Sequence, residues 1–409
     1  MVQNKKPQIR FKGFTDAWEQ RKFENIFKVS QGLQIPISER YLEPAINRYF
    51  YITNEFLKDS CEKSYYIESP AENVICNEED ILMTRTGNTG IVVTDVKGCF
   101  HNNFFKIKYD KTQLSKRYIC CLLSSDKMRK IILNSAGSST IPDLSHDSFY
   151  KIEGYFPKQK VEQDKIGQLF KSIDNLITIH QFKLDKLVKI KNTLLEKMFP
   201  KNNNKVPEIR FKGFFDEWEE HKLDDFGKST GGISIESEFS EDGKYKVISI
   251  GSYSESSTYN DQGIRCKLSN RTKDRILNKD DIAMILNDKT SSGNIIGRVL
   301  LIDKSGLYVY NQRTERIEID KKEYDPLFIY ELLNAPNIRK KIIKESQGNT
   351  QIYVNWTKIK ELIYYVPNIE EQRKLGVYLK NIDNLIMLYQ CKLDKIKKVK
   401  KTIQRKMLV

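Results

Sequence analysis

One segment of the chain occurs twice, and this internal duplication limits the possible folds more than any other feature of the sequence. The stretch PQIRFKGFTDAWEQRK begins at Pro7 and PEIRFKGFFDEWEEHK begins at Pro207, with eleven of sixteen positions identical. We call these stretches the first and second leading segments. A chain of 409 residues exceeds one ordinary domain, so the repeat predicts two domains that begin alike.

A longer pair of similar segments begins at Glu162 and Glu371 and shares twenty of thirty-eight positions at a constant offset of 209. Each follows a proline and holds no other proline, which favours a long helix. Apolar residues recur in both at spacings of three, four or seven, which is typical of a coiled-coil seam: Ile166, Phe170, Ile173, Ile177, Leu184, Leu187, Leu194 and Met198, then Leu375, Leu379, Ile382, Ile386, Leu393, Ile396, Ile403 and Met407. We predict two long helices that pack on each other, antiparallel because a two-fold pseudo-axis relates them.

Between each leading segment and its helix lies a body of different character. Short β-rich runs such as YFYIT and YKVISI alternate with Gly and Asn turns, and helical patches follow them. The predicted fold class is α+β, with two pseudo-symmetric β-rich domains separated by an antiparallel coiled coil of two long helices. The expected boundaries are 1–157 for the first domain, 158–200 for the first helix, 201–206 for a linker, 207–366 for the second domain and 367–409 for the second helix.

The composition indicates the class of partner and the compartment. A formal net charge of +15 and a pI near 9.2 favour a polyanion, usually nucleic acid, although a merely soluble basic surface would also fit. The seven cysteines form no C-x-x-C pair, which favours reduced thiols. No apolar run is long enough for a membrane span, so we expect no membrane partner and a cytoplasmic location.

The sequence shows no motif for catalysis by this chain. Neither an N-P-P-[YF] tetrapeptide nor an F-x-G-x-G loop of a methyltransferase is present, and RTGNTG lacks the Lys and Ser/Thr of a P-loop. The four His show no metal-ligand spacing. We therefore expect no catalytic residue, no metal site and no cofactor bound by this chain.

Polar or basic side chains in the turns of the bodies can reach base edges, with Arg suited to guanine and Asn or Gln suited to adenine. Ordinary turn chemistry or a phosphate contact is the alternative for each of them. The candidates for DNA contact are Arg85, Thr86, Asn88, Ser138, Ser139, Arg313, Arg316, Asn349, Thr350 and Gln351.

The leading segments and helices are alike in both halves, whereas the bodies differ. Surfaces that stay alike suit two copies of one partner related by the pseudo-two-fold, and surfaces that differ suit two different ligands. The candidates for partner docking are Phe14, Trp18, Phe214, Trp218, Asp174 and Asp383.

The order of these parts resembles the specificity subunit of type I restriction–modification systems. The resemblance is carried by P-x-I-R-F-K-G-F-x-D-x-W-E, by D-I-L-x-T-R-x-G-x-x-G from Asp80 to Gly90, and by E-Q-x-K-I-G at the helix start. It implies target-recognition domains that each read half of a bipartite site in double-stranded DNA. It also implies two modification subunits that methylate adenine, and restriction subunits that cleave. S-adenosylmethionine, ATP and Mg would belong to those partners.

The second half departs from the family pattern, because Ile285 and Leu286 stand where the first has Thr84 and Arg85, and extra residues precede Gly297. A role like that of Arg85 is therefore not expected there. Two alternative functions remain at this point. One is a stand-alone bipartite DNA-binding regulator, and the other, a pure coiled-coil scaffold, leaves the large bodies without a purpose.

Overall fold

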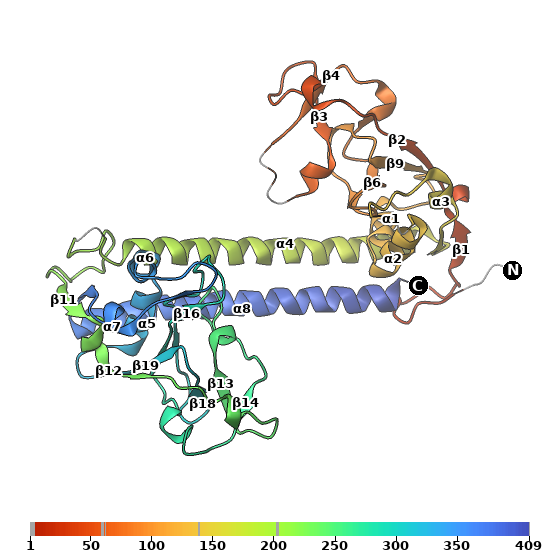
Figure 1. Ribbon diagram of the computed structural model, residues 1–409. Helices are drawn as coiled ribbons and strands as arrows, with labels where there is room; N and C mark the ends of the chain where they lie inside the picture. Colours follow the sequence, from red (N-terminus) through yellow and green to blue (C-terminus); the bar gives the residue numbers. More distant parts are fainter. Residues whose placement is uncertain (1–4, 59–60, 62, 138–139, 202–203, 409) are drawn as a thin grey trace. The chain divides into compact units, whose positions relative to one another are not determined.

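The structure, a computed structural model, describes residues 5–58, 61, 63–137, 140–201 and 204–408 (Figure 1). The chain divides into two compact units: residues 1–181 with 391–409 form the first, and residues 182–390 form the second. Each unit holds one body and part of both long helices, α4 (Lys160–Lys197) and α8 (Ile369–Met407).

The first body combines two four-stranded sheets, ordered β2-β9-β6-β7 and β4-β3-β8-β5, with a pair of strands, β1-β10. Apolar runs such as β6 are buried along their whole length, as expected of a central strand. The strands are β1 (Glu19–Lys22), β2 (Phe27–Gln31), β3 (Arg48–Ile52), β4 (Tyr66–Glu68), β5 (Ile75–Cys76), β6 (Ile81–Thr84), β7 (Val92–Val93), β8 (Gly98–Phe100), β9 (Phe104–Tyr109) and β10 (Glu153–Phe156), and the short helices are α1 (Lys116–Leu123), α2 (Asp126–Ser135) and α3 (His146–Tyr150).

The second body has the same order in its main sheet, β12-β19-β15-β17, and a matching pair, β11-β21. Its second sheet has three strands, β14-β13-β18, and it adds the pair β16-β20. Proline stands at the first turn of both α5 and α6, where its missing N–H costs nothing. The strands are β11 (Glu219–Lys222), β12 (Gly227–Gly231), β13 (Tyr245–Ile248), β14 (Arg265–Cys266), β15 (Ile282–Ile285), β16 (Asn287–Asp288), β17 (Val299–Leu301), β18 (Tyr308–Tyr310), β19 (Thr314–Ile319), β20 (Ile352–Tyr353) and β21 (Ile363–Val366), and the helices are α5 (Pro326–Asn334), α6 (Pro336–Lys344) and α7 (Trp356–Ile359).

The two long helices pack on each other as the heptad spacing predicts. In the first unit, Ile166 and Phe170 near the start of α4 share a core with Ile403 and Met407 near the end of α8. In the second unit, the end of α4 shares a core with the start of α8. The helices are therefore antiparallel, and all sixteen predicted seam residues are buried or half-buried. The prediction of the fold class is confirmed.

Each leading segment binds the end of a long helix. The backbone N–H of Ile9 donates to the carbonyl of Lys406 at 3.1 Å, and that of Ile209 donates to the carbonyl of Lys197 at 2.9 Å. These bonds satisfy carbonyls that a helix C-terminus otherwise leaves without a partner. The duplicated segments thus have a structural role within the chain.

A buried ion pair joins each leading segment to the start of a long helix. Arg10 donates through Nε and Nη2 to Glu162 at 2.6 and 2.8 Å, and Arg210 donates likewise to Glu371 at 2.8 and 2.7 Å. Both carboxylates are nearly inaccessible, at 1 % and 0 % exposure. The bidentate geometry gives these pairs both strength and direction. We call them the first and second junctions.

The residues next to the junctions explain the rest of the E-Q-x-K-[IL]-G pattern. Gln163 accepts from the N–H of Ser115 at 3.0 Å, and Gln372 accepts from the N–H of Asp325 at 2.9 Å. A Cβ on Gly167 would lie 2.4 Å from Cβ of Arg117, so this close approach of helix and body requires glycine. The pattern therefore describes how a body packs on its helix.

Candidate nucleic-acid interface

The net positive charge lies mostly on the long helices. Helix α4 carries eight Lys against five Asp and Glu, and α8 carries eleven Lys and Arg against four. Ten of the fifteen net positive charges are therefore on these two helices. The bodies are therefore close to charge balance, and a nucleic acid would be recognised there through hydrogen-bonding groups.

Several loops of the first body converge at one end of its sheets, and we call them the first edge: residues 32–34, 85–90, 101–103 and 140–144. The N–H of Arg85 donates to the carbonyl of Asn103 at 2.7 Å, and the N–H of Leu144 donates to the carbonyl of Arg85 at 2.9 Å. The side chain of Asn102 donates to Oε1 of Gln34 at 3.0 Å. Segments up to about a hundred residues apart in the chain thus meet in one polar surface.

The residues of the first edge that the sequence predicts to contact DNA differ in whether their side chains are engaged by other residues of the body. Arg85 pairs with Asp143 at 2.8 Å, and its guanidinium lies over the ring of Phe105 at 5.4 Å. Thr86 also donates to Asp143. Both side chains therefore bind the neighbouring loop, and their contact with DNA stays a prediction. Asn88 is exposed, and Ser138 and Ser139 lie outside the described residues.

The second body builds an equivalent surface, the second edge, from residues 232–236, 286–297, 311–313 and 346–354. The N–H of Leu286 donates to the carbonyl of Arg313 at 2.8 Å, and the N–H of Val354 donates to the carbonyl of Leu286 at 2.9 Å. Leu286 therefore occupies the place of Arg85, as the sequence alignment predicts. The predicted correspondence of Gly90 and Gly297 is also confirmed, since the N–H of Gly90 donates to Thr84 at the end of β6 and that of Gly297 donates to Ile285 at the end of β15.

The structure brings most second-body candidates to this edge. Arg313 is exposed and has a positive φ of 72°, which is uncommon for a residue with a side chain. Asn349, Thr350 and Gln351 are exposed in the loop before β20. Arg316 is an exception, because it lies within β19 and pairs with Asp281 at 2.8 Å with only 13 % of its side chain exposed. Its side chain is therefore engaged within the body, and its contact with DNA stays a prediction.

The sequence did not reveal one polar cluster of the second edge. The carboxylate of Glu236 accepts from Asn311 at 2.9 Å and from Gln312 at 3.2 Å. Hydrogen bonds from Ser234 and Asn311 lower the pKa of Glu236 below its usual range, so the group is ionised at neutral pH. The only local signal is a glycine, Gly232, at which a Cβ would lie 2.1 Å from the carbonyl oxygen of Asn311.

The structure places four of the six predicted docking residues in contacts within their own units. Trp18 and Trp218 are 0 % and 1 % exposed and belong to the cores of their units, so neither ring can meet a partner. Asp174 pairs with Lys400, and Asp383 pairs with Lys191; both pairs join α4 to α8.

Phe14 and Phe214 remain half-buried, each with a lysine over its ring, at 5.1 Å for Lys165 and 4.9 Å for Lys374. Of the predicted docking residues, the two tryptophans are buried and the two aspartates are ion-paired. Phe14 and Phe214 are the two whose side chains are partly accessible.

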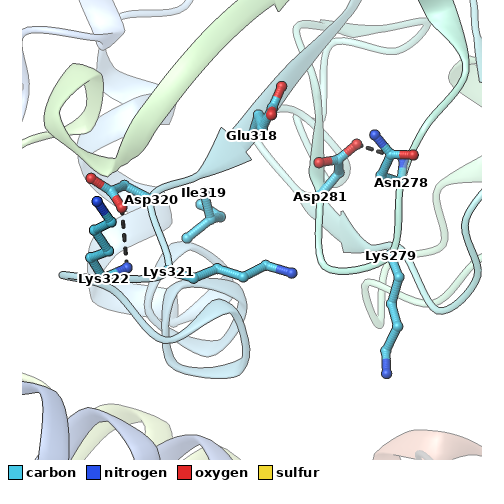
Figure 2. A pocket seen from close by; sticks show the side chains of 8 residues that line it. All are labelled: Asn278, Lys279, Asp281, Glu318, Ile319, Asp320, Lys321 and Lys322. Atoms are coloured by element: carbon cyan, nitrogen blue, oxygen red, sulfur yellow. Dashed lines mark hydrogen bonds between the residues drawn. The ribbon is translucent and has the colours of Figure 1, made fainter.

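A pocket of about 450 Å³ lies at the other end of β19 from Arg313, lined by Asn278, Lys279, Asp281, Glu318, Ile319, Asp320, Lys321 and Lys322 (Figure 2). Its charges balance, and its carboxylates are already engaged. Asp281 accepts from the N–H of Asn278 at 2.7 Å, and Asp320 accepts from the N–H of Lys322 at 3.1 Å. A surface of mixed sign does not attract a polyanion, so this pocket is not the candidate interface.

The described part of the chain shows neither a metal site nor a membrane-spanning helix. No group of three or more His, Cys, Asp or Glu there is placed to hold a metal ion. Within the same residues, no helix has the length and apolar character needed to cross a membrane.

Comparison with known proteins gives consistent matches along the chain. The family described as "Type I restriction modification DNA specificity domain" matches residues 15–189 and 215–398. A curated relative, the type I restriction enzyme MjaVIII specificity subunit of Methanocaldococcus jannaschii, is 26 % identical over 385 residues, which cover 88 % of this chain and 85 % of that one.

Two solved structures have a similar fold. The S subunit of a type I restriction–modification system from M. genitalium gives a TM-score of 0.68 at 15 % identity and 99 % coverage of both chains. A chain from a study of complex assembly and conformational transition of the type I R-M system gives a TM-score of 0.53 at 12 % identity, with 95 % of this chain and 97 % of that one covered.

Proposed function

Because this chain belongs to the family of type I restriction–modification DNA specificity proteins, we propose that it is the non-catalytic DNA-recognition subunit of such a complex. Each body reads one half of an asymmetric bipartite site in double-stranded DNA. One observation carries this proposal: the main sheets of the two bodies have the same strand order, β2-β9-β6-β7 and β12-β19-β15-β17, yet their edges present different side chains. A shared scaffold with different polar edges suits two recognition sites of one kind that read different sequences.

The long helices support a fixed distance between the two half-sites. Helix α4 has 38 residues and α8 has 39, which corresponds to roughly 57 Å at the rise of an α-helix. Their seam is apolar and continuous, and such a seam resists bending where a flexible linker would not. We propose that the helices set the number of unread base pairs.

Selection from a random duplex library tests the recognition function. The chain, purified with its modification subunit, is expected to enrich one asymmetric site with two different half-sites at a constant separation. Enrichment without sequence preference, or of a symmetric site, would contradict the proposal. A site bound equally well by the chain alone would favour a stand-alone regulator instead.

Two copies of a partner are expected to dock on a flank of each long helix that the seam does not use. Leu176 and Ile179 are 48 % and 49 % exposed, and their counterparts Leu385 and Leu388 are 44 % and 46 % exposed. Residues three apart share a helix face, so each pair forms an apolar patch. The Phe14–Lys165 and Phe214–Lys374 contacts lie about three turns before these patches. We propose that one modification subunit binds each patch.

Native mass spectrometry of the reconstituted complex tests this docking. The native chain is expected to bind two modification subunits, and Leu176→Glu or Leu385→Glu is expected to remove one of them. Thr178→Glu is the matched control, because Thr178 is exposed but lies on the other flank of α4. A Leu176→Glu chain that keeps two partners would exclude this surface.

Catalysis belongs to the partners in this proposal. Modification subunits would bring S-adenosylmethionine for adenine methylation, and restriction subunits would bring ATP and Mg for cleavage of unmodified DNA. The complex would work in the cytoplasm. This chain would contribute sequence choice and assembly.

A further inference from the structure

The turn between two strands occupies the same place in both edges but carries different chemistry. Residues 101–103 join β8 to β9, and residues 311–313 join β18 to β19. The backbone bonds of Asn103 to Arg85 and of Arg313 to Leu286 align the two turns residue by residue. Asn102 therefore corresponds to Gln312, and Asn103 corresponds to Arg313.

In each body the central amide of this turn donates to a side chain in the loop after β2 or β12. In the first edge, Asn102 donates to the amide oxygen of Gln34 at 3.0 Å. In the second edge, Gln312 donates to the carboxylate of Glu236 at 3.2 Å. The equivalent hydrogen bond between loop and turn thus holds a neutral amide, that of Gln34, in the first body and a negatively charged carboxylate, that of Glu236, in the second.

The negative charge is exposed and held in position. Glu236 is exposed, and Ser234, Asn311 and Gln312 all donate to it. Asn311 in turn accepts from the N–H of Ile235 at 3.1 Å, so the loop and the turn move as one piece. A carboxylate on a DNA-binding surface lowers affinity for phosphates, which indicates that it serves discrimination between partners.

We propose that Glu236 and Arg313 together read one C·G base pair in the half-site of the second body. In the major groove cytosine offers its N4 amino donor, which a carboxylate accepts, and guanine offers its N7 and O6 acceptors, which a guanidinium fits. A base with an acceptor facing Glu236 leaves the carboxylate desolvated and repelled. Asn311 and Gln312 act as positioning residues. This inference rests on the proposed function and assigns a base preference to the second edge.

The variant Glu236→Gln tests the inference, because glutamine keeps the length of the side chain and an oxygen for Asn311 and Gln312. Site selection from the random duplex library is repeated with the variant in the complete complex. Discrimination for cytosine at one position of the second half-site is expected to fall on the order of 10- to 100-fold. The other positions and the first half-site are expected to stay unchanged.

Glu241→Gln is the matched control, since Glu241 is an exposed carboxylate between the same two strands. It removes the same charge and is expected to leave every base preference intact. If both variants raise affinity alike and neither changes a base preference, Glu236 acts only through charge and the inference is overturned. An unchanged site with Glu236→Gln overturns it as well.

A second variant keeps the test valid if Glu236→Gln destabilises the fold. Gln34→Glu places a carboxylate at the corresponding hydrogen bond of the first edge, where Asn102 can still donate to it. A changed base preference at one position of the first half-site is the expected result, and an unchanged first half-site would count against the inference. Failure of the native complex to select any site would overturn the proposed function itself, which is a different outcome.

Discussion

The main sheets of the two bodies have the same strand order, but the bodies differ in the residues at equivalent positions. The register of β9 and β19 against β6 and β15 places Phe105 of the first body where the second has Glu315. The turn, loop and helix positions that contact the long helices are alike, as the two junctions show. The comparison teaches that a duplicated chain keeps the residues with which it packs on itself, and varies those at the two edges and those that only fill a body.

The largest expected effect is the loss of stability when the buried ion pair of either junction is broken. Arg10→Met removes the partner of Glu162, and Arg210→Met removes the partner of Glu371, leaving in each case a buried carboxylate. A loss of about 3 to 5 kcal/mol in the stability of the affected unit is expected from each. Urea titration followed by hydrogen exchange, which reports each unit separately, measures it.

The double variants Arg10→Met/Glu162→Leu and Arg210→Met/Glu371→Leu are the controls for the junctions. Each is expected to lose less stability than its single counterpart, because no unpaired charge stays buried. A loss below about 1 kcal/mol from either single variant would mean that the junctions behave as surface ion pairs. The two junctions would then not be the shared contacts that stabilise both halves.

An effect of intermediate size is expected in how the stability of each unit depends on pH, because the slope has opposite sign in the two units. In the second unit, burial raises the pKa of Glu315 to about 7 and raises that of Glu331 above its usual range. The folded unit therefore holds more protons than the unfolded chain from about pH 4.5 to pH 7, and its stability falls as pH rises through this window. In the first unit, burial lowers the pKa of His101, so that group adds stability as pH rises toward about 6.5.

Hydrogen exchange in urea at pH 5, 6, 7 and 8 measures both slopes. For each carboxyl group with a raised pKa, the free energy of unfolding is expected to fall across this window by up to about 1.4 kcal/mol for every unit by which its folded and unfolded pKa values differ. Glu315→Gln and Glu331→Gln are expected to flatten the second slope and leave the first unaltered. Equal slopes in the two units would contradict the comparison.

The smallest effect concerns Arg85, whose place Leu286 takes in the second body. Arg85→Leu breaks an ion pair in which Asp143 is 48 % exposed, and exposed pairs are worth about 0 to 1 kcal/mol. A stability loss within that range and an unchanged first half-site are expected from urea titration and site selection. Loss of one base preference would show that Arg85 contacts DNA despite its pairing.

The local periodic features of this fold could be predicted from the sequence, and the contacts between distant segments could not. The heptad spacing from Ile166 to Met198 records a repeat between near neighbours, so the seam and the helices were predictable. The tie between Glu236 and Asn311 spans 75 residues, and no local pattern marks it. Trp18 was predicted to dock a partner because the halves are identical there, whereas its burial depends on contacts between distant segments that the sequence does not mark.

The candidate site was predictable only in part for the same physical reason. Turn residues such as Arg313 and Asn349 stand out by composition, and the structure places them at one edge. Whether such a side chain is free depends on its neighbours in space. Arg316 has the same side chain as Arg313, but it lies within strand β19, where its guanidinium pairs with Asp281.

Hydrogen exchange of the complete complex with and without DNA tests the central claim, that the two edges are the surfaces that read sequence. The probe is a duplex carrying the selected site, and the control is a duplex with both half-sites scrambled. Amides of residues 85–90, 101–103, 286–297 and 311–313 are expected to exchange more slowly with the selected duplex only. Residues 278–281 and 318–322, which line the pocket, are expected to stay unchanged. Protection of the pocket with no change at either edge would contradict the account.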